Sequence, residues 1–518
     1  MSSDIDSGPE KSSPGLELLR VSTLLAVVAA QLFLASRAAK VPFAYCFTRP
    51  FWLDEFHTLT VVQEERADQL LSKLARGGDF NPPGLHLILW LIYRATPLSD
   101  EALLRGFSCT CGAAGLAATY FLLRARFGWR VSWLSALGMV SSSPQLLQQM
   151  FEARTYSFWF ASIAVFCLLL TRPSTRSWAT VAIGAAAVAM CSIHYFGIIV
   201  LGVIAGSQLC CNFHEVRQRW LIGTACTAGV IALVAWLPLY FSQRGSVPVA
   251  TWIPSPTLGG SGTFIAESIV TCALTMPVLA YGLQLLVYGP GSASSESGLE
   301  FKVFAGTCGL ILWPLVLTAF SYIIQPAQVA RYAVPTALAY APLIALISRR
   351  LKQNVLTGLG FVFFIVGFGG ALVVYEIRPD YREAIPLVRS SSVERPLVVH
   401  WRVVAYPLVR YTRADPNAVR ISYLFRGEQL SRFDDWEQAV ARRMGELFEL
   451  PKTLETDELA SLNEFCLLAV KGEEARYRSW TAEPLGPVVG PLYAYRMVRS
   501  SGASSRPKRS GADGATSY

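Results

Sequence analysis

The sequence predicts a polytopic α-helical membrane protein with a small soluble α/β domain at its C-terminal end. Three observations lead to this fold class: 53% of the 518 residues are hydrophobic, only 16% are charged, and the apolar residues gather in long runs. Soluble domains contain about 25% charged residues, so the deficit indicates a lipid bilayer. The net charge of +9 calls for no nucleic-acid partner, because most lysines and arginines lie in short loops between apolar runs.

The apolar runs predict about 11 transmembrane helices, since each approaches the roughly 20 residues that cross a bilayer. The first run follows a polar tail, 1–16, which lacks a cleavable signal pattern and is expected in the cytoplasm. The segment 83–97 is apolar but only about 15 residues long, which is typical of a helix at the membrane interface. The runs lie at 17–38, 103–123, 131–150, 155–171, 177–194, 196–211, 220–241, 264–288, 302–324, 332–348 and 355–375, within a transmembrane domain over 17–377.

Basic loops indicate which way the chain crosses the membrane. With a cytoplasmic N-terminus and an interfacial helix at 83–97, all basic clusters at the span ends face the cytoplasm, as the positive-inside rule requires. If 83–97 crossed, every cluster would face outside. The first loop, 39–102, and the loop 242–261 are therefore expected on the extracytoplasmic face. The clusters are Arg124, Arg126 and Arg130; Arg172 and Arg176; Arg217 and Arg219; and Arg349, Arg350 and Lys352.

After the last span the composition becomes that of a soluble domain, over 378–498. The segments 397–404, 419–425 and 465–470 are predicted to be strands, and 434–450 an amphipathic helix. These elements predict the small extracytoplasmic α/β domain. The tail 499–518 is rich in serine and glycine and is expected to be disordered.

An adjacent pair of acids, Asp54 and Glu55, follows the first span. Phe51, Trp52 and Phe56 flank the pair, and such bulky apolar neighbours indicate partial burial at the membrane face. Burial removes water from a carboxylate and can move its pKa towards the range useful for proton transfer. Acids at this depth are candidates for a functional site. The alternative is a solvated loop that merely follows a span.

Metal binding is not predicted. The eleven cysteines lack the paired spacing and the partner histidines of a zinc site. Carboxylate oxygens suit a divalent cation, but a single acidic pair offers too few ligands to predict one. No cofactor is expected to be required.

Six short motifs occur in one order along the chain and carry a resemblance. The chain resembles the GT-C glycosyltransferases, and among them the family of dolichyl-phosphate-mannose protein O-mannosyltransferases, lipid A aminoarabinose transferases and lipopolysaccharide galacturonosyltransferases. The likeness covers roughly 15–495. Besides the acid pair, the motifs are 79–83 (DFNPP), 152–156 (EARTY), 194–196 (HYF), 251–254 (TWIP), 331–335 (RYAVP) and 380–384 (DYREA).

The resemblance implies an integral-membrane transferase that uses a polyprenyl-phosphate sugar donor and inverts the anomeric carbon. Asp54 would be the general base that acts on the acceptor, and Glu55 would help to orient acceptor or donor. Arg154 and Arg331 are candidates for the donor phosphate, since arginine offers paired hydrogen bonds to phosphate oxygens. Related sequences often carry lysine or histidine where this chain has Asn81, so we expect Arg154, Arg331 or His86 to take over that contact.

Other candidates carry a structural alternative. Glu152 and Arg154 could form an ion pair that caps a helix, and Arg331 could anchor a span at the interface. Histidines at the membrane face often only bond a neighbouring backbone group. Trp252 could pack on a sugar or lie in the aromatic belt. The full candidate set adds Tyr332 beside the phosphate and, near the substrate, Tyr156, His194 and Tyr195; His57 is a further histidine candidate.

Three functions remain open from the sequence. The first is the glycosyltransferase, with a sugar-lipid donor and a glycan, lipid or protein acceptor of the cell envelope. The second is a secondary transporter or lipid flippase, which usually places polar groups near the bilayer midplane on repeated, broken helices. The third is a scaffold whose C-terminal domain binds a partner. Clustering of the charged residues at one membrane face favours the first function. Both a bacterial plasma membrane and an endoplasmic-reticulum membrane remain open as the location. The short C-terminal domain and the lack of Asn-X-Ser/Thr sequons favour the bacterial membrane, with the site facing the periplasm.

Overall fold

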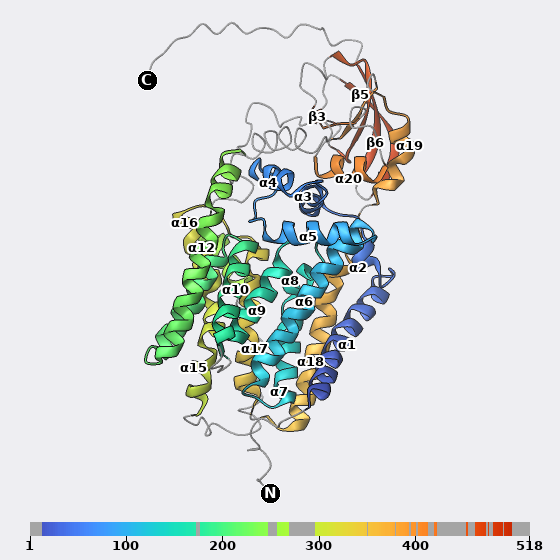
Figure 1. Ribbon diagram of the computed structural model, residues 1–518. Helices are drawn as coiled ribbons and strands as arrows, with labels where there is room; N and C mark the ends of the chain where they lie inside the picture. Colours follow the sequence, from blue (N-terminus) through green and yellow to red (C-terminus); the bar gives the residue numbers. More distant parts are fainter. Residues whose placement is uncertain are drawn as a thin grey trace. The chain divides into compact units, whose positions relative to one another are not determined.

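Figure 1 shows the computed structural model, which describes residues 13–171, 177–246, 256–268, 296–349, 351–378, 380–392, 395–399, 402–412, 419–421, 452–453, 461–472, 475, 480–489 and 492–499. The chain divides into two compact units, Met1–Arg378 and Pro379–Tyr518. The boundary lies one residue beyond the expected end of the transmembrane domain.

The first unit is helical. Within the described ranges, six helices are long and apolar enough to cross a membrane, and four shorter apolar helices accompany them, so this is an integral-membrane unit. In chain order the main helices are α1 Pro14–Ala38, α2 Tyr45–Thr48, α3 Leu53–Val62, α4 Ala67–Ala75, α5 Gly84–Ala95, α6 Asp100–Arg124, α7 Trp129–Ser141, α8 Pro144–Gln149, α9 Tyr156–Thr171, α10 Ser177–Ile193, α11 Gly197–Asn212, α12 Val216–Ser246, α13 Leu258–Ile265, α15 Glu296–Gly309, α16 Trp313–Ile323, α17 Val334–Ser348 and α18 Gln353–Ala371.

Glycines of α6 allow close contact with α9 and with Met150 at the end of α8. A Cβ atom on Gly115 of α6 would lie 2.5 Å from the Phe160 ring of α9, and one on Gly112 would lie 2.4 Å from Met150. Small residues allow such close approach in membrane helices. The helix α7 packs against α17 and α18, and α10 packs against α12, so one buried apolar cluster runs through the unit.

The expected single span at 131–150 is wrong, because the structure breaks it into α7 and α8. Pro144 lacks a backbone N–H and restricts the residue before it, which ends the preceding helix. Ser143 then caps α8 by accepting the N–H of Leu146 at 3.2 Å. The expected run 302–324 also divides, into α15, a 3₁₀ turn at Leu310–Leu312 (η2) and α16. The expected span 264–288 lies mostly outside the described residues.

Three helices of the segment between α1 and α6, namely α3, α4 and α5, gather at the end of the helical bundle where α1 ends (Figure 1). The helix α5 has 12 residues, as expected for an interfacial element at 83–97. It packs against the end of α10 so closely that a Cβ on Gly84 would lie 2.5 Å from the Ser192 carbonyl oxygen. Trp90 donates its indole N–H to the Glu64 carbonyl at 2.8 Å, which ties α5 to the end of α3.

The second unit contains a six-stranded sheet in the order β3-β2-β1-β4-β6-β5. The strands β1 to β4 run parallel, whereas β6 is antiparallel to both β4 and β5. Its core includes Val398, Phe465, Leu467 and Met497. The strands are β1 Leu397–Val399, β2 Val419–Ile421, β3 Lys452–Thr453, β4 Glu464–Val470, β5 Trp480–Val489 and β6 Leu492–Arg499, and the helices include α19 Ile385–Arg389 and α20 Arg402–Thr412.

The predicted strand 465–470 is confirmed as β4. The predicted strand at 397–404 is wrong beyond Val399, because the chain turns into α20, whose buried Ala405 and Leu408 have helical spacing. Both β5 and β6 were absent from the sequence prediction. Pro484 and Pro487 mask the pattern of β5, and they are tolerated because β5 is an edge strand with register shifts. The predicted helix 434–450 and residues 500–518 of the tail lie outside the described residues.

Candidate active site

The first ion pair of the candidate site joins Asp54 to Arg331. Asp54 lies in the first turn of α3, and Arg331 lies in the 3₁₀ turn Ala330–Ala333 (η3) that precedes α17. One Nη atom of Arg331 is 2.9 Å from Asp54 Oδ2, and the two side chains are 16% and 19% exposed. The Arg331 guanidinium also lies 5.8 Å from the centre of the Trp52 ring, a cation–π distance. This pair is therefore partly open to solvent.

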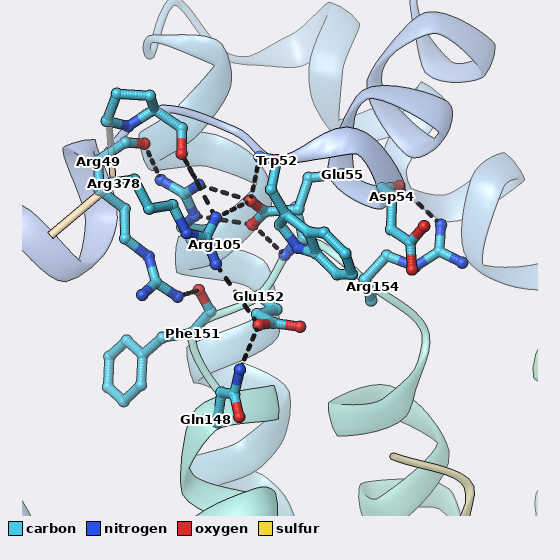
Figure 2. Close-up of polar contacts among 12 residues, drawn as sticks. Arg49, Trp52, Asp54, Glu55, Arg105, Gln148, Phe151, Glu152, Arg154 and Arg378 are labelled. Carbon is cyan, nitrogen blue, oxygen red and sulfur yellow. Dashed lines mark hydrogen bonds and ion pairs between the residues drawn. The ribbon is translucent and has the colours of Figure 1, made fainter. Parts of the chain in front are cut away.

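The second arginine, Arg154, comes from the turn between α8 and α9. Its Nη1 donates to the Asp54 backbone carbonyl at 2.8 Å (Figure 2). It also donates to Thr58 Oγ1 at 3.3 Å. The same atom donates to a carboxylate oxygen of Asp79 at 2.9 Å. Arg154 therefore contacts both the backbone of the helical turn that carries Asp54 and a second acid.

Asp79 is a site residue that the sequence reasoning missed, although it begins the DFNPP motif. One carboxylate oxygen accepts from Arg154 and lies 3.2 Å from His86 Nε2. The other accepts from the backbone N–H of Phe80 at 2.6 Å and from Asn81 Nδ2 at 2.9 Å. Burial raises the pKa of Asp79, but Arg154 and His86 outweigh burial and hold the pKa well below its ordinary value. Asp79 is thus an ionised, buried acid whose two oxygens both accept hydrogen bonds.

Glu55 is fully buried and lies in a separate network (Figure 2). Its carboxylate accepts from Arg105 at 2.9 and 2.7 Å and from Arg378 at 2.5 Å. It also accepts the backbone N–H groups of Ala153 at 2.9 Å and Trp52 at 3.2 Å. Burial raises the pKa of Glu55, but the two guanidinium groups lower it to about 2.

This placement corrects one expectation. Glu55 is 0% exposed, so its carboxylate has no surface with which to orient an acceptor or a donor. Its bonds instead fix the start of α3, the helix that carries Asp54. The sequence reasoning missed Arg105 and Arg378. An arginine inside the predicted span 103–123 was the available signal for Arg105, because charges in spans are rarely without a partner.

Glu152 and Arg49 complete the buried network (Figure 2). Glu152 accepts from Gln148 at 2.9 Å and lies 3.5 Å from Arg378. Arg49 donates to the carbonyls of Phe151 and Val374 and so connects the α8–α9 turn to the end of α18. Burial and the neighbouring Glu55 raise the pKa of Glu152. The network ties α3, α6, the α8–α9 turn and the end of α18 to one another.

Several of the other candidates form an aromatic cluster beside Arg331. The His194 ring stacks on Trp159 with 4.4 Å between centres, and His194 Nδ1 accepts the N–H of Phe196 at 3.1 Å. Tyr332 lies 5.5 Å from His194 and 6.1 Å from Tyr156, again between ring centres. The bond from the Phe196 N–H is the backbone contact that was the structural alternative for His194, and the aromatic cluster adds a packing role.

Tyr195 takes part through a different contact. Its hydroxyl donates to Gln243 Oε1 at 2.8 Å. Gln243 in turn donates to the backbone carbonyls of Asp79 and Asn81 at 2.9 and 3.2 Å. Tyr195 and the end of α12 therefore support the loop that holds Asp79.

The structure brings Asp54, Arg154 and Arg331 together, and it joins His86 and Asn81 to them through Asp79. His57 lies on α3, half-buried. Trp252 lies outside the described residues. Among the residues that the structure describes, no three His, Cys, Asp or Glu side chains gather in a group that could hold a metal ion. The roles assigned to all these residues remain predictions.

Comparisons with known proteins point to one fold. No protein-family model matches the chain, and no curated protein matches it. ArnT from Cupriavidus metallidurans in the apo state matches with a TM-score of 0.60 and 13% identity, over 93% of this chain and 98% of that chain. ArnT bound to undecaprenyl phosphate matches with a TM-score of 0.55 and 14% identity, over 94% and 98%.

The apo oligosaccharyltransferase from Archaeoglobus fulgidus matches with a TM-score of 0.46 and 12% identity, over 92% of this chain and 74% of that chain. The two ArnT structures, with TM-scores of 0.60 and 0.55, establish the architecture. They cover nearly the whole of both chains, and they bear out the polytopic helical fold with a small C-terminal sheet. This chain therefore has the fold of ArnT.

Proposed function

We propose that this protein is an integral-membrane glycosyltransferase that moves a sugar from a polyprenyl-phosphate donor to an acceptor at the extracytoplasmic face. The observation that carries the proposal is the Asp54–Arg331 ion pair at 2.9 Å, partly open to solvent and adjoined by Arg154. Transfer of a sugar from a phosphate leaving group needs a base for the acceptor and cations for the phosphate, and this site contains one such acid and two arginines.

The chemistry follows from these groups. Asp54 takes the proton of the acceptor hydroxyl as that oxygen attacks the anomeric carbon, which makes the oxygen a stronger nucleophile. The bond from the anomeric carbon to the donor phosphate breaks on the opposite side, so the configuration inverts and polyprenyl phosphate leaves. Negative charge grows on the departing phosphate, and the guanidinium groups of Arg154 and Arg331 stabilise it.

The donor class is supported by the fold, since ArnT has been solved with undecaprenyl phosphate bound. The distribution of basic loops supports an orientation with Asp54 outside the cytoplasm. We propose a bacterial plasma membrane as the location and the periplasm as the compartment that the site faces. The acceptor is proposed to be a glycan, a lipid or a protein of the cell envelope.

A transfer assay with the purified full-length protein tests this proposal. Labelled undecaprenyl-phosphate sugars and envelope acceptors are mixed with protein in detergent, and the labelled product and released undecaprenyl phosphate are measured. We expect transfer with inversion. If the protein shows no transfer and no donor hydrolysis with any of the common sugars, the enzymatic assignment is excluded. Movement of intact sugar-lipid across liposomes without bond cleavage would instead support a flippase.

The variant Asp54→Asn tests the role of the base. Because the substitution keeps the size of the side chain and removes proton acceptance, kcat should fall by about 10²–10⁴-fold while donor affinity stays close to normal. The control is Asp68→Asn, which changes an exposed acid paired with Arg66 on α4 of the same loop. This variant should keep full activity. Near-normal kcat in Asp54→Asn would exclude Asp54 as the base.

A further inference from the structure

We infer that Asp79 is a positioning residue of the reaction, which holds Arg154 where the phosphate of the donor binds. This inference rests on the proposed function and deepens it. It assigns a role to an acid that neither the paired-acid motif nor the expected phosphate contacts include.

The geometry leaves Asp79 little freedom. Both of its oxygens are engaged, one by Arg154 and His86 and the other by Phe80 N–H and Asn81. Its backbone carbonyl accepts from Gln243 at 2.9 Å, which fixes the loop from the side of α12. A carboxylate held at every oxygen and at its backbone is a rigid partner for an arginine.

The charges explain why Arg154 needs this partner. Its side chain is only 9% exposed, and a buried guanidinium without an acid is strongly unfavourable. Arg331 is paired with Asp54, whereas the Nη1 contacts of Arg154 with Asp54 and Thr58 involve a neutral carbonyl and a hydroxyl. Asp79 is therefore the acid in ion-pair contact with Arg154 among the described residues.

Arg154 also keeps capacity for a ligand. Its three described hydrogen bonds all leave from Nη1, and its Nε is buried with no hydrogen-bond partner in the described part of the chain. Arginine carries five N–H donors in a planar fork. With Nη1 fixed by Asp79, the plane of the fork is set before any ligand arrives, which reduces the entropy lost on binding phosphate.

The same contacts exclude Asp79 as a second base. A base must accept a proton from an acceptor hydroxyl within hydrogen-bond reach. Asp79 is 4% exposed, and both of its oxygens already receive donors from the protein. It therefore acts through Arg154 rather than on the reacting atoms.

The test measures binding of undecaprenyl phosphate to the full-length protein by titration calorimetry in detergent. We expect Asp79→Asn to raise the Kd by about 10–100-fold, the coupling typical of residues in direct contact. Arg154→Gln should show a similar loss. If Asp79 acts through Arg154, the double variant Asp79→Asn/Arg154→Gln should bind no more than about twofold worse than Arg154→Gln alone.

Two further variants separate positioning from folding. Asp68→Asn, the exposed acid on α4, should leave the Kd within about twofold, because surface ion pairs contribute little. Asp79→Glu keeps the charge and should recover part of the affinity. If Asp79→Asn does not survive purification, the same cycle is run with Asp79→Glu. The inference is overturned if the Asp79 substitution raises the Kd by the same factor in the wild type and in Arg154→Gln. It is also overturned if Asp79→Asn leaves the Kd unchanged.

The outcome is distinguishable from a failure of the proposed function. If the wild-type protein binds undecaprenyl phosphate and transfers no sugar, the enzymatic proposal fails and the binding cycle still decides the role of Asp79. If transfer is observed and the Asp79 variants bind normally, the inference alone fails. If the wild-type protein does not bind undecaprenyl phosphate, both the proposed function and the inference about Asp79 fail.

Discussion

Two buried glutamates of one network should respond in opposite ways to the same substitution. Glu55 and Glu152 both lie near Arg378, and both are almost fully buried. Glutamine has nearly the size of glutamate, so Glu55→Gln and Glu152→Gln remove one charge each with little change of packing. We expect Glu55→Gln to destabilise the protein and Glu152→Gln to leave stability unchanged or raise it.

The magnitude for Glu55 follows from its pKa. Arg105 and Arg378 outweigh burial and lower the pKa from 4.5 to about 2. At about 1.4 kcal/mol per pKa unit, this difference corresponds to roughly 3–4 kcal/mol of stability. The expected loss in Glu55→Gln is about 3–5 kcal/mol, because Arg105 stays fully buried and loses the Glu55 carboxylate.

The pH dependence has a definite sign for each acid. The depressed pKa of Glu55 means that its contribution is fully present above pH 4.5 and is lost as the pH falls towards 2. Glu152 has a raised pKa, because burial and the charge of Glu55 oppose its ionisation. Its folded form therefore binds protons more readily than its unfolded form, and stability rises as the pH falls through that pKa. Glu152→Gln should abolish this rise.

Thermal unfolding in detergent measures both effects. Tryptophan fluorescence follows the transition for the wild type and the two variants between pH 5 and pH 8. Glu55→Gln should lower the apparent Tm by several degrees at every pH in this range, whereas Glu152→Gln should not lower it at pH 8. An equal decrease in the apparent Tm of the two variants would refute the reasoning, because it would show that both acids stabilise the protein to the same extent.

Two further predictions concern α5 and the proposed donor site. Gly84→Ala should destabilise the protein by about 1–3 kcal/mol, because the new Cβ would lie 2.5 Å from the Ser192 backbone carbonyl. Gly106→Ala should instead raise the apparent Tm, because the space around its new Cβ is open. If the two variants change the apparent Tm by the same amount, the close approach of α5 to Ser192 is contradicted. Arg331→Gln should weaken undecaprenyl phosphate binding at least tenfold. Arg94→Gln, which changes an exposed arginine of α5, should leave the binding unchanged. The Kd of each variant is measured by the same binding titration.

The sequence was sufficient for the elements whose signal is local. Hydropathy predicted the long helices, and the short apolar length of 83–97 predicted α5, because bilayer thickness fixes how long a span must be. The break between α7 and α8 was not predicted, although Ser143 and Pro144 are a capping serine and a first-turn proline. The mean hydropathy of the run hides this break, because two residues change the average over a long apolar segment very little.

Partners distant in the sequence explain what was missed at the site. Asp79 follows Gly77 and Gly78 and precedes two prolines, which is the composition of a solvated turn. Its burial depends on Arg154, which lies 75 residues further along the chain. The position of Arg105 inside a predicted span indicates that it has a partner, but the partner, Glu55, is 50 residues away in the sequence. Such pairings are set by tertiary structure.

The acid pair itself shows how neighbours in sequence divide two tasks. Successive residues on an α-helix point about 100° apart, so Asp54 and Glu55 in the first turn of α3 cannot face the same site. Asp54 turns towards Arg331 and solvent, whereas Glu55 turns towards Arg105 and is 0% exposed. Glu55 therefore anchors the turn on which Asp54 stands. Exchanging the two residues should abolish transfer, because aspartate is too short for the Glu55 contacts and the base would lose its anchored helix.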